Sequence, residues 1–308
     1  MTNTQLRTFV EVAATGSIRE AAERLVVTPP AVSAALAALQ RELGVALVVR
    51  EGRGLRVSPA GEVFAGYARQ LLGLMEEAKL AAAGHVHPER GRVRLAAVNP
   101  VGEYVVPDVL AQFRTRYPDA EVTLEVGNRA HVWDLLAHRQ VDLAIGGRPP
   151  IGGRLATFAT RPTALVVVAA ASAAEPKGTT QWRDVSAAHL EQQVWLLREP
   201  GSGTRAATEE FLAELGIEPR SLTLGSNGSI RESVQVGLGV TLAALDSVER
   251  RLARGTLEEW RCPGLPRPRA WHIAGRAGEE PPATARLLLE HLVSKDRSPW
   301  LAEVATPR

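Results

Sequence analysis

Residues 28–44 read TPPAVSAALAALQRELG and predict a short helix with a defined beginning and end. Thr28 suits the N-cap position, and Pro29 suits the first helical position, where its missing N–H costs nothing. Apolar side chains recur at spacings of four, three and four, which places them on one helical face: Val32, Leu36, Leu39 and Leu43. Gly44 then suits the left-handed conformation that ends many helices.

The opposite face of this helix carries small, nearly uncharged side chains: Pro30, Ser33, Ala34, Ala37 and Arg41. Such a face lets a helix approach another surface closely, as entry into the DNA major groove requires. A packing module of three helices without any DNA role is the alternative that these residues alone leave open.

Two further helices are predicted before it. Leu6, Phe9, Val10 and Ala13 recur at helical spacing over residues 3–14, and Gly16 ends that helix. Ser17 followed by Glu20 is a capping-box pattern that starts the second helix.

Two short strands, 46–49 and 55–57, are predicted after residue 44, with a glycine-rich turn at 50–54. Arg50 and Arg53 lie in this turn. A hairpin with arginine at its tip, directly after the helices, is the wing of a winged helix-turn-helix. It can reach phosphates or the minor groove. Residues 1–58 are therefore predicted to form a DNA-binding domain.

A long helix is predicted over residues 59–84, because Ser58 and Pro59 form a cap-then-proline start. Its apolar stripe has no obvious core inside a sixty-residue domain: Ala60, Phe64, Tyr67, Ala68, Leu71, Met75 and Ala78. We expect this linker helix to pair with a second copy. Packing of the helix on the C-terminal part of its own chain is the alternative.

The order of residues in this region resembles the LysR-type DNA-binding signature. The matching positions are Ala21, Ala22, residues 28–33, Leu39, residues 42–44, Leu47, Arg50 and residues 59–61. The resemblance implies that seven residues contact double-stranded DNA: Thr28, Pro29, Pro30, Ser33, Ala34, Arg50 and Arg53. It also implies a homo-oligomer, a dimer or tetramer, on an interrupted inverted repeat. Pro29 and Ala34 stand where Gln and Arg are usual, which removes two donors from the DNA face.

Residues 85–92, with His85 and His87, are predicted as a polar hinge rather than a metal site. Beyond the hinge, apolar strands and amphipathic helices alternate, which indicates α/β architecture. We expect an effector domain over 93–298 with two lobes, 93–162 with 269–298 and 163–268. The fold class is then α/β: a winged helix-turn-helix, a linker helix and a two-lobed effector domain.

Loops at the carboxyl ends of the predicted strands carry candidate ligand-binding residues. They are Asn99, Pro100, Val101, Gly102, Asn128, Gly147, Arg148, Gly201, Ser202, Gly203, Thr204, Arg205, Ser226 and Asn227. Residues 201–205 would offer free N–H groups at a helix start and a guanidinium, which together suit an anion. Plain helix capping and an uncharged ligand are the alternatives.

This region resembles the CbbR-like branch of the LysR family, which implies a periplasmic-binding-protein-like fold. The matching segments are 127–129, 142–145, 148–150, 197–205 and 237–240. Asn99 and Pro100 depart from the branch, where a Ser-Thr pair is usual, so the effector is expected to differ. The family also implies contact with RNA polymerase.

Other features restrict the function further. The net charge is only +2, Cys262 has no partner for a disulfide, and the N-terminus lacks a secretory signal. We therefore expect a cytoplasmic regulator without membrane contact, metal or cofactor. An enzyme acting on a phosphorylated or carboxylate substrate in the same cleft is the alternative, although no catalytic motif supports it. A solute-binding protein would carry a signal peptide and lack residues 1–58.

Overall fold

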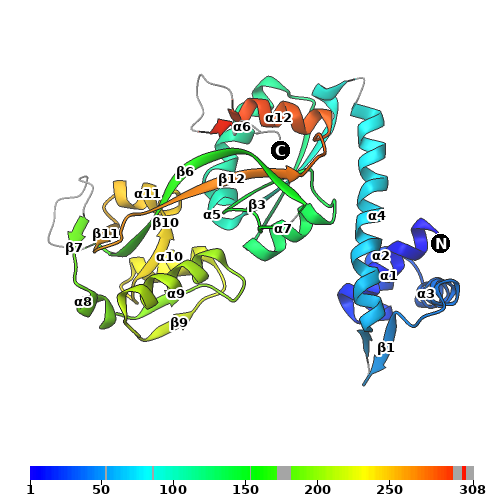
Figure 1. Ribbon diagram of the computed structural model, residues 1–308, viewed down its shortest axis with the longest axis horizontal. Helices are drawn as coiled ribbons and strands as arrows, with labels where there is room; N and C mark the ends of the chain where they lie inside the picture. The colour runs from blue at the N-terminus through cyan, green and yellow to red at the C-terminus, as the bar shows by residue number, and fades with distance from the viewer. Residues whose placement is uncertain (53, 85–86, 153, 172–181, 294–299, 303–308) are drawn as a thin grey trace. The chain divides into compact units, whose positions relative to one another are not determined.

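The structure, a computed structural model, describes residues 1–308 apart from 53, 85–86, 153, 172–181, 294–299 and 303–308. The chain divides into two compact units (Figure 1). Unit 1 is Met1–Val86 with Ala137–Gln140, and unit 2 is His87–Leu136 with Val141–Arg308.

Unit 1 contains four helices and a hairpin among its described residues: α1 Asn3–Thr15, α2 Ile18–Leu25, α3 Pro29–Leu43, β1 Val48–Glu51, β2 Gly54–Val57 and α4 Pro59–Gly84. Gly16, Val26 and Gly44 end the first three helices in the left-handed conformation. The helices enclose one core: Leu6, Phe9, Val12, Ala21, Ala22, Val32, Leu36, Leu39, Leu47, Ala65 and Ala68. The predicted three-helix arrangement is therefore present.

The first strand of the hairpin lies two residues later than predicted, whereas the second begins one residue earlier and ends at the predicted residue. Arg50 and Glu51 belong to β1 and pair with Leu55 and Gly54, so Arg50 is not in the turn. The backbone N–H of Leu47 is instead bonded to Gln40 Oε1 at 2.8 Å, which holds the start of this segment against α3. Arg53 lies outside the described residues.

The first lobe of unit 2 is a parallel sheet with the order β4–β3–β5. Its elements are η1 Pro88–Arg90, β3 Arg92–Val98, α5 Asn99–Tyr104, α6 Val106–Arg116, β4 Glu121–Gly127, α7 Arg129–Ala137, β5 Leu143–Gly146 and α12 Ala283–Val293. Part of the predicted hinge is thus ordered, since η1 and the start of β3 occupy 88–92. The segment 99–102, expected as a loop, is the start of α5.

The second lobe contains a small parallel pair, β8–β9, and strands of the main sheet. Its elements are β7 Trp182–Asp184, α8 Ala187–Glu191, β8 Trp195–Leu197, α9 Gly203–Leu215, β9 Ser221–Thr223, α10 Asn227–Gln235, β10 Thr241–Ala244, α11 Leu245–Ala253 and β11 Leu257–Arg261.

Two long antiparallel strands connect the lobes, β6 Leu155–Ala170 and β12 Arg267–Arg276 (Figure 1). The short β13 Leu301–Ala302 also pairs with β6. Side chains alternate along a strand: Leu165, Val167 and Ala169 of β6 enter one core, while Val166 and Val168 enter the other. The shared strands join strands of both lobes into one sheet, from which the β8–β9 pair is separate.

Candidate functional site

The described residues that are predicted to face DNA lie at the start of α3 and on β1 of the hairpin. Thr28, Pro29, Pro30, Ser33, Ala34 and Arg50 are all exposed. Thr28 occupies the N-cap position as predicted, but its side chain makes no capping hydrogen bond. This face of α3 is therefore small and solvent-accessible, as the sequence indicates, while its contact with DNA stays a prediction.

A cavity of about 830 Å³ lies in unit 2 and is lined from both lobes and from the connecting strands. The lining residues are Val98, Asn99, Pro100, Gly127, Asn128, Arg129, Gly147, Arg148, Thr163, Leu165, Arg198, Ser202, Gly203, Thr204, Ala206, Ala207, Glu210, Pro268, Arg269, Ala270, Trp271 and His272. This volume is in the range of small-molecule sites in proteins.

Eight of the predicted ligand-binding residues line this cavity: Asn99, Pro100, Asn128, Gly147, Arg148, Ser202, Gly203 and Thr204. Ser202 is the N-cap of α9 and accepts a hydrogen bond from the N–H of Arg205. The start of α9 therefore faces the cavity with the positive end of its dipole, which favours an anion there.

Six predicted residues lie elsewhere: Val101, Gly102, Gly201, Arg205, Ser226 and Asn227. Val101 and Gly102 turn into the core because the chain continues from β3 directly into α5. Val101 is fully buried, and a Cβ on Gly102 would lie 2.7 Å from Val126 Cγ2. Gly201 adopts a positive φ of 85° in the turn before α9.

The guanidinium of Arg205 is directed away from the cavity. Its Nε donates to Glu209 Oε1 at 2.8 Å, one turn along α9, and its Nη1 donates to the Arg198 carbonyl at 3.0 Å. Ser226 caps α10, because its hydroxyl accepts a hydrogen bond from the N–H of Ser229 at 3.0 Å. For this loop the structure therefore shows helix capping, which the sequence left open as the alternative to ligand binding.

Arg198 also lines the cavity, together with Arg129, Arg148 and Arg269, and only Arg148 of these four is among the predicted residues. Arg198 is 4% exposed and donates to both carboxylate oxygens of Glu199 at 2.7 Å. These hydrogen bonds lower the pKa of the Glu199 carboxyl. With the Asn99 amide oriented to suit its neighbours, Asn99 accepts from Arg198 Nη2 at 2.8 Å and donates to the Gly127 carbonyl at 3.2 Å.

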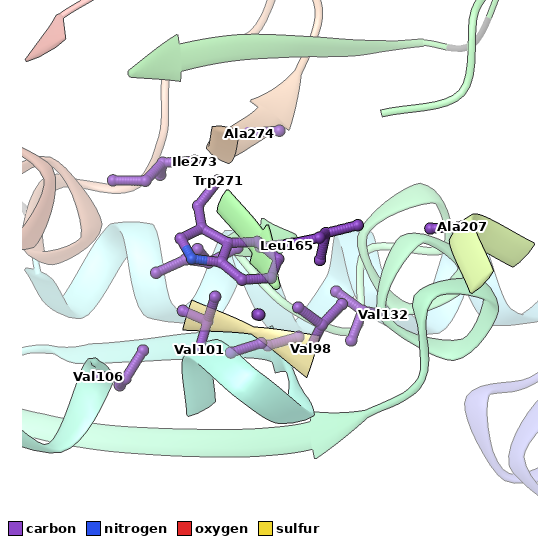
Figure 2. Close-up of a cluster of buried hydrophobic side chains, with 14 of the residues drawn as sticks. Val98, Val101, Val106, Val132, Leu165, Ala207, Trp271, Ile273 and Ala274 are labelled. Atoms are coloured by element: carbon purple, nitrogen blue, oxygen red, sulfur yellow. The ribbon is translucent and has the colours of Figure 1, made fainter. Parts of the chain in front are cut away.

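Further lining residues come from segments whose position the sequence does not indicate. Arg269, Trp271 and His272 lie on β12, and Thr163 and Leu165 lie on β6. Trp271 is packed among Leu165 and other apolar side chains, as Figure 2 shows. Only the pairing of two distant strands brings these residues to one wall.

Asp246, at the start of α11, binds both connecting strands. Its carboxylate accepts from Thr163 Oγ1 at 2.6 Å, from Trp271 Nε1 at 2.7 Å and from Arg161 Nη1. Burial opposes ionisation, but the hydrogen bonds from these three side chains keep the pKa of Asp246 below its ordinary value. Asp246 therefore fixes the strands that form one wall of the cavity.

Other predictions concern metals and membranes. Across the described residues, no group of three or more His, Cys, Asp or Glu side chains gathers as metal ligands. His87 is paired with Glu89, and His85 lies outside the described residues. No single helix in the described ranges is long and apolar enough to cross a membrane, and α2 and α3 reach that length only when joined across a bend of 106°.

Two family models match the chain. The bacterial regulatory helix-turn-helix protein model of the lysR family matches residues 3–62, and the LysR substrate binding domain model matches residues 87–297. The second match contains every residue that lines the cavity.

Individual proteins are similar over nearly the whole chain. The HTH-type transcriptional activator CmpR of a Synechocystis strain is 29% identical, with 97% of each chain covered. The HTH-type transcriptional regulator CbbR of Xanthobacter flavus is 32% identical, with 97% of this chain and 89% of the relative covered. The CcmR regulatory domain of Synechocystis PCC6803, solved in complex with 2-PG, is 27% identical with a TM-score of 0.58, covering 67% of this chain and 99% of that one.

Proposed function

The chain belongs to the LysR family of bacterial transcriptional regulators, and we propose on this premise how it binds DNA and which class of ligand controls it. It is a DNA-binding regulator of the CbbR-like branch with an effector-binding domain. Both curated relatives are transcriptional regulators, so they give the enzyme alternative no support. We propose that an anionic, phosphorylated metabolite binds in the 830 Å³ cavity.

The exposed face of α3 would enter the major groove, with Ser33 near base edges. The hairpin would place Arg50 against phosphates or in the minor groove. The exposure of these residues supports the proposal, because no other part of unit 1 covers them. With Pro29 and Ala34 on the face, few hydrogen-bond donors are available for base edges, so we expect DNA shape to contribute strongly to specificity.

The helix α4 would join two copies. Five large apolar side chains on it are exposed by 39–67%: Val63, Tyr67, Leu71, Leu74 and Met75. They recur at helical spacing, and pairing with a second α4 would remove them from water. A symmetric pair would bind two half-sites of an interrupted inverted repeat.

The observation that carries the effector proposal is that Arg198 and the start of α9 line the same cavity. Arg129 and Arg148 from the first lobe line the same cavity, and Arg129 Nη2 donates to the Arg148 carbonyl at 3.0 Å. Guanidinium groups and a helix N-terminus together select phosphate or carboxylate groups. The 2-PG complex of the similar CcmR domain makes 2-PG the first ligand to test.

Ligand contacts from both lobes would change the equilibrium between their arrangements, because a ligand shifts a conformational equilibrium through differential contacts. Asn128 and Arg148 of the first lobe and Thr204 of the second would contact one ligand together. The connecting strands β6 and β12 are the segments that would bend.

Calorimetric titration of the full chain with 2-PG tests this proposal, with inorganic phosphate and glycerol as comparison ligands. We expect 2-PG to bind, and Arg148→Ala and Thr204→Val each to weaken it about tenfold or more, as the loss of a charged or hydrogen-bonded contact of at least about 1.4 kcal/mol implies. Ser226→Ala is the control, because Ser226 caps α10 outside the cavity. Binding of glycerol alone, or full affinity in both cavity variants, would place the effector elsewhere.

We also infer contact with RNA polymerase and a cytoplasmic location, which DNA-binding regulation of transcription entails. Pull-down of RNA polymerase by the DNA-bound regulator would support the first inference.

A further inference from the structure

A second, much smaller cavity lies behind the effector cavity, at the start of α10. Its volume is about 20 Å³, enough for one water molecule or one monatomic ion. It is lined by Pro100, Arg198, Thr204, Asn227, Ile230, Arg231, Thr241, Leu242, Ala243, Ala244 and Ser247. No carboxylate is among these lining residues. Glu103 and Glu199, which pair with Arg231 and Arg198, lie outside the lining.

Arg231 is buried beside this cavity with donors that the described chain does not use. It is 5% exposed, yet its Nε and Nη1 have no hydrogen-bond partner among the described residues. Its Nη2 donates to Glu103 Oε2 at 3.0 Å, and its guanidinium lies 4.6 Å from the centre of the Tyr104 ring. Unpaired buried donors are costly, so a partner is expected.

Asn227 contributes a third unused donor. Its Oδ1 accepts from Arg198 Nη1, which directs the amide nitrogen away from that guanidinium. The buried Nδ2 then has no partner within the described chain. Asn227 is also the first residue of α10, whose N-terminus adds a partial positive charge.

We propose that a halide, with chloride as the physiological form, binds in this second cavity. Unpaired N–H donors of Arg231 and Asn227 line a space large enough for one monatomic ion, and the start of α10 adds partial positive charge, so an anion is favoured there. Phosphate, sulfate and carboxylates are too large for about 20 Å³. This proposal does not rest on the effector proposal, although Pro100, Arg198 and Thr204 line both cavities.

Crystals of the full chain soaked in bromide test the site directly by anomalous diffraction. The expected result is an anomalous peak within hydrogen-bond distance of Asn227 Nδ2 and of one unpaired Arg231 nitrogen, Nε or Nη1. A water molecule in the cavity with no anomalous signal, or donors bonded to other protein atoms, would overturn the proposal. The proposal would also be overturned if bromide occupied the cavity in crystals but halides had no effect on thermal unfolding in solution.

Thermal unfolding in solution gives the second readout, at constant ionic strength in sodium glutamate, sulfate, chloride or bromide. Chloride and bromide should raise Tm saturably by about 2–4 °C relative to glutamate, and sulfate should not. Arg231→Gln should abolish this halide-specific rise. Arg250→Gln, which removes only an exposed pair with Asp108, should retain it.

Asn227→Asp covers the case in which Arg231→Gln does not fold. It keeps the oxygen that accepts from Arg198 but replaces the donor with a negative charge, so the halide effect should disappear. A halide-specific rise that persists in either folded variant contradicts the proposal, as does an equal rise with sulfate.

Discussion

At the residue scale, Asp246 shows how one carboxylate supports the cavity. Its three hydrogen-bond donors come from β6 and β12, and its side chain is 10% exposed. Removing its charge would leave the guanidinium of Arg161 and the indole N–H of Trp271 poorly satisfied. The fold of unit 2 should therefore depend on ionisation of this single group.

Asp246→Asn should lower the free energy of unfolding of unit 2 by about 1–3 kcal/mol at neutral pH. The pKa of Asp246 is lower in the folded state than in the unfolded state, whose ordinary value is about 3.9. The stabilisation by the ionised carboxylate is therefore complete when the pH is well above this ordinary value, and it is lost as the pH falls through the folded-state pKa. The difference between native protein and variant should therefore shrink in acid.

Urea denaturation followed by tryptophan fluorescence measures this effect in unit 2, since all six tryptophans lie there. Asp108→Asn is the control, because its pair with Arg250 is exposed and should contribute less than about 1 kcal/mol. If Asp246→Asn lowers the free energy of unfolding equally at neutral and acid pH, the charge of Asp246 does not stabilise unit 2.

The limits of sequence reasoning are also visible at single residues. Residues 198–205 begin and end with arginine, and Arg205 is the one predicted to bind the ligand because it lies at the helix start. In the fold, Arg205 pairs with Glu209 along α9, and Arg198 at the end of β8 reaches the cavity. The direction of β8 and the burial of the side chain distinguish Arg198 from Arg205. No local sequence pattern predicts that direction or that burial.

At the scale of elements, helix ends were the most predictable feature. Thr28 with Pro29, Ser17 with Glu20, and the glycines at 16 and 44 mark boundaries that the structure reproduces within one residue. These signals are local, because a cap satisfies N–H groups in its own first turn. The first strand of the hairpin begins two residues later than predicted, where Gln40 Oε1 accepts from the N–H groups of Leu47 and Val48.

The two DNA-facing elements should contribute differently to binding. Arg50→Ala on the hairpin should weaken binding to operator and random DNA alike and reduce the salt slope by about one, because phosphate contacts carry little base identity. Ser33→Ala on α3 should weaken operator binding more than random binding.

Fluorescence anisotropy at several salt concentrations distinguishes these effects. Arg114→Ala, an exposed change on α6 in unit 2 that removes the same charge, should leave both affinities unchanged. If the Arg50 and Ser33 variants lose operator and random binding in equal proportion, the assigned roles are wrong.

At the scale of the whole molecule, the pairing of β6 with β12 was the feature least accessible from sequence. Residues 155–165 pair with 267–276, more than a hundred positions away, and the first of these segments contains Pro162. Only the part of β6 from Ala164 onwards has the continuous apolar pattern of a buried strand. Its earlier half is mixed in polarity because it is paired with β12 but only partly buried.

The composition of the cavity follows from that pairing. The first-lobe loops and the start of α9 were predictable, because parallel strands end at the same edge of a sheet. The wall formed by Thr163, Leu165, Arg269, Trp271 and His272 was not, because it depends on contacts between distant segments.

The most direct test of the central claim is a footprint on the DNA upstream of the protein's own gene, with and without 2-PG. The native chain should protect two regions offset by whole helical turns, and 2-PG should change that protection. Arg148→Ala should bind the same DNA without responding to 2-PG, and Leu71→Asp with Leu74→Asp should lose the paired protection. A single isolated half-site, or a 2-PG response that survives in Arg148→Ala and Thr204→Val, would contradict the account.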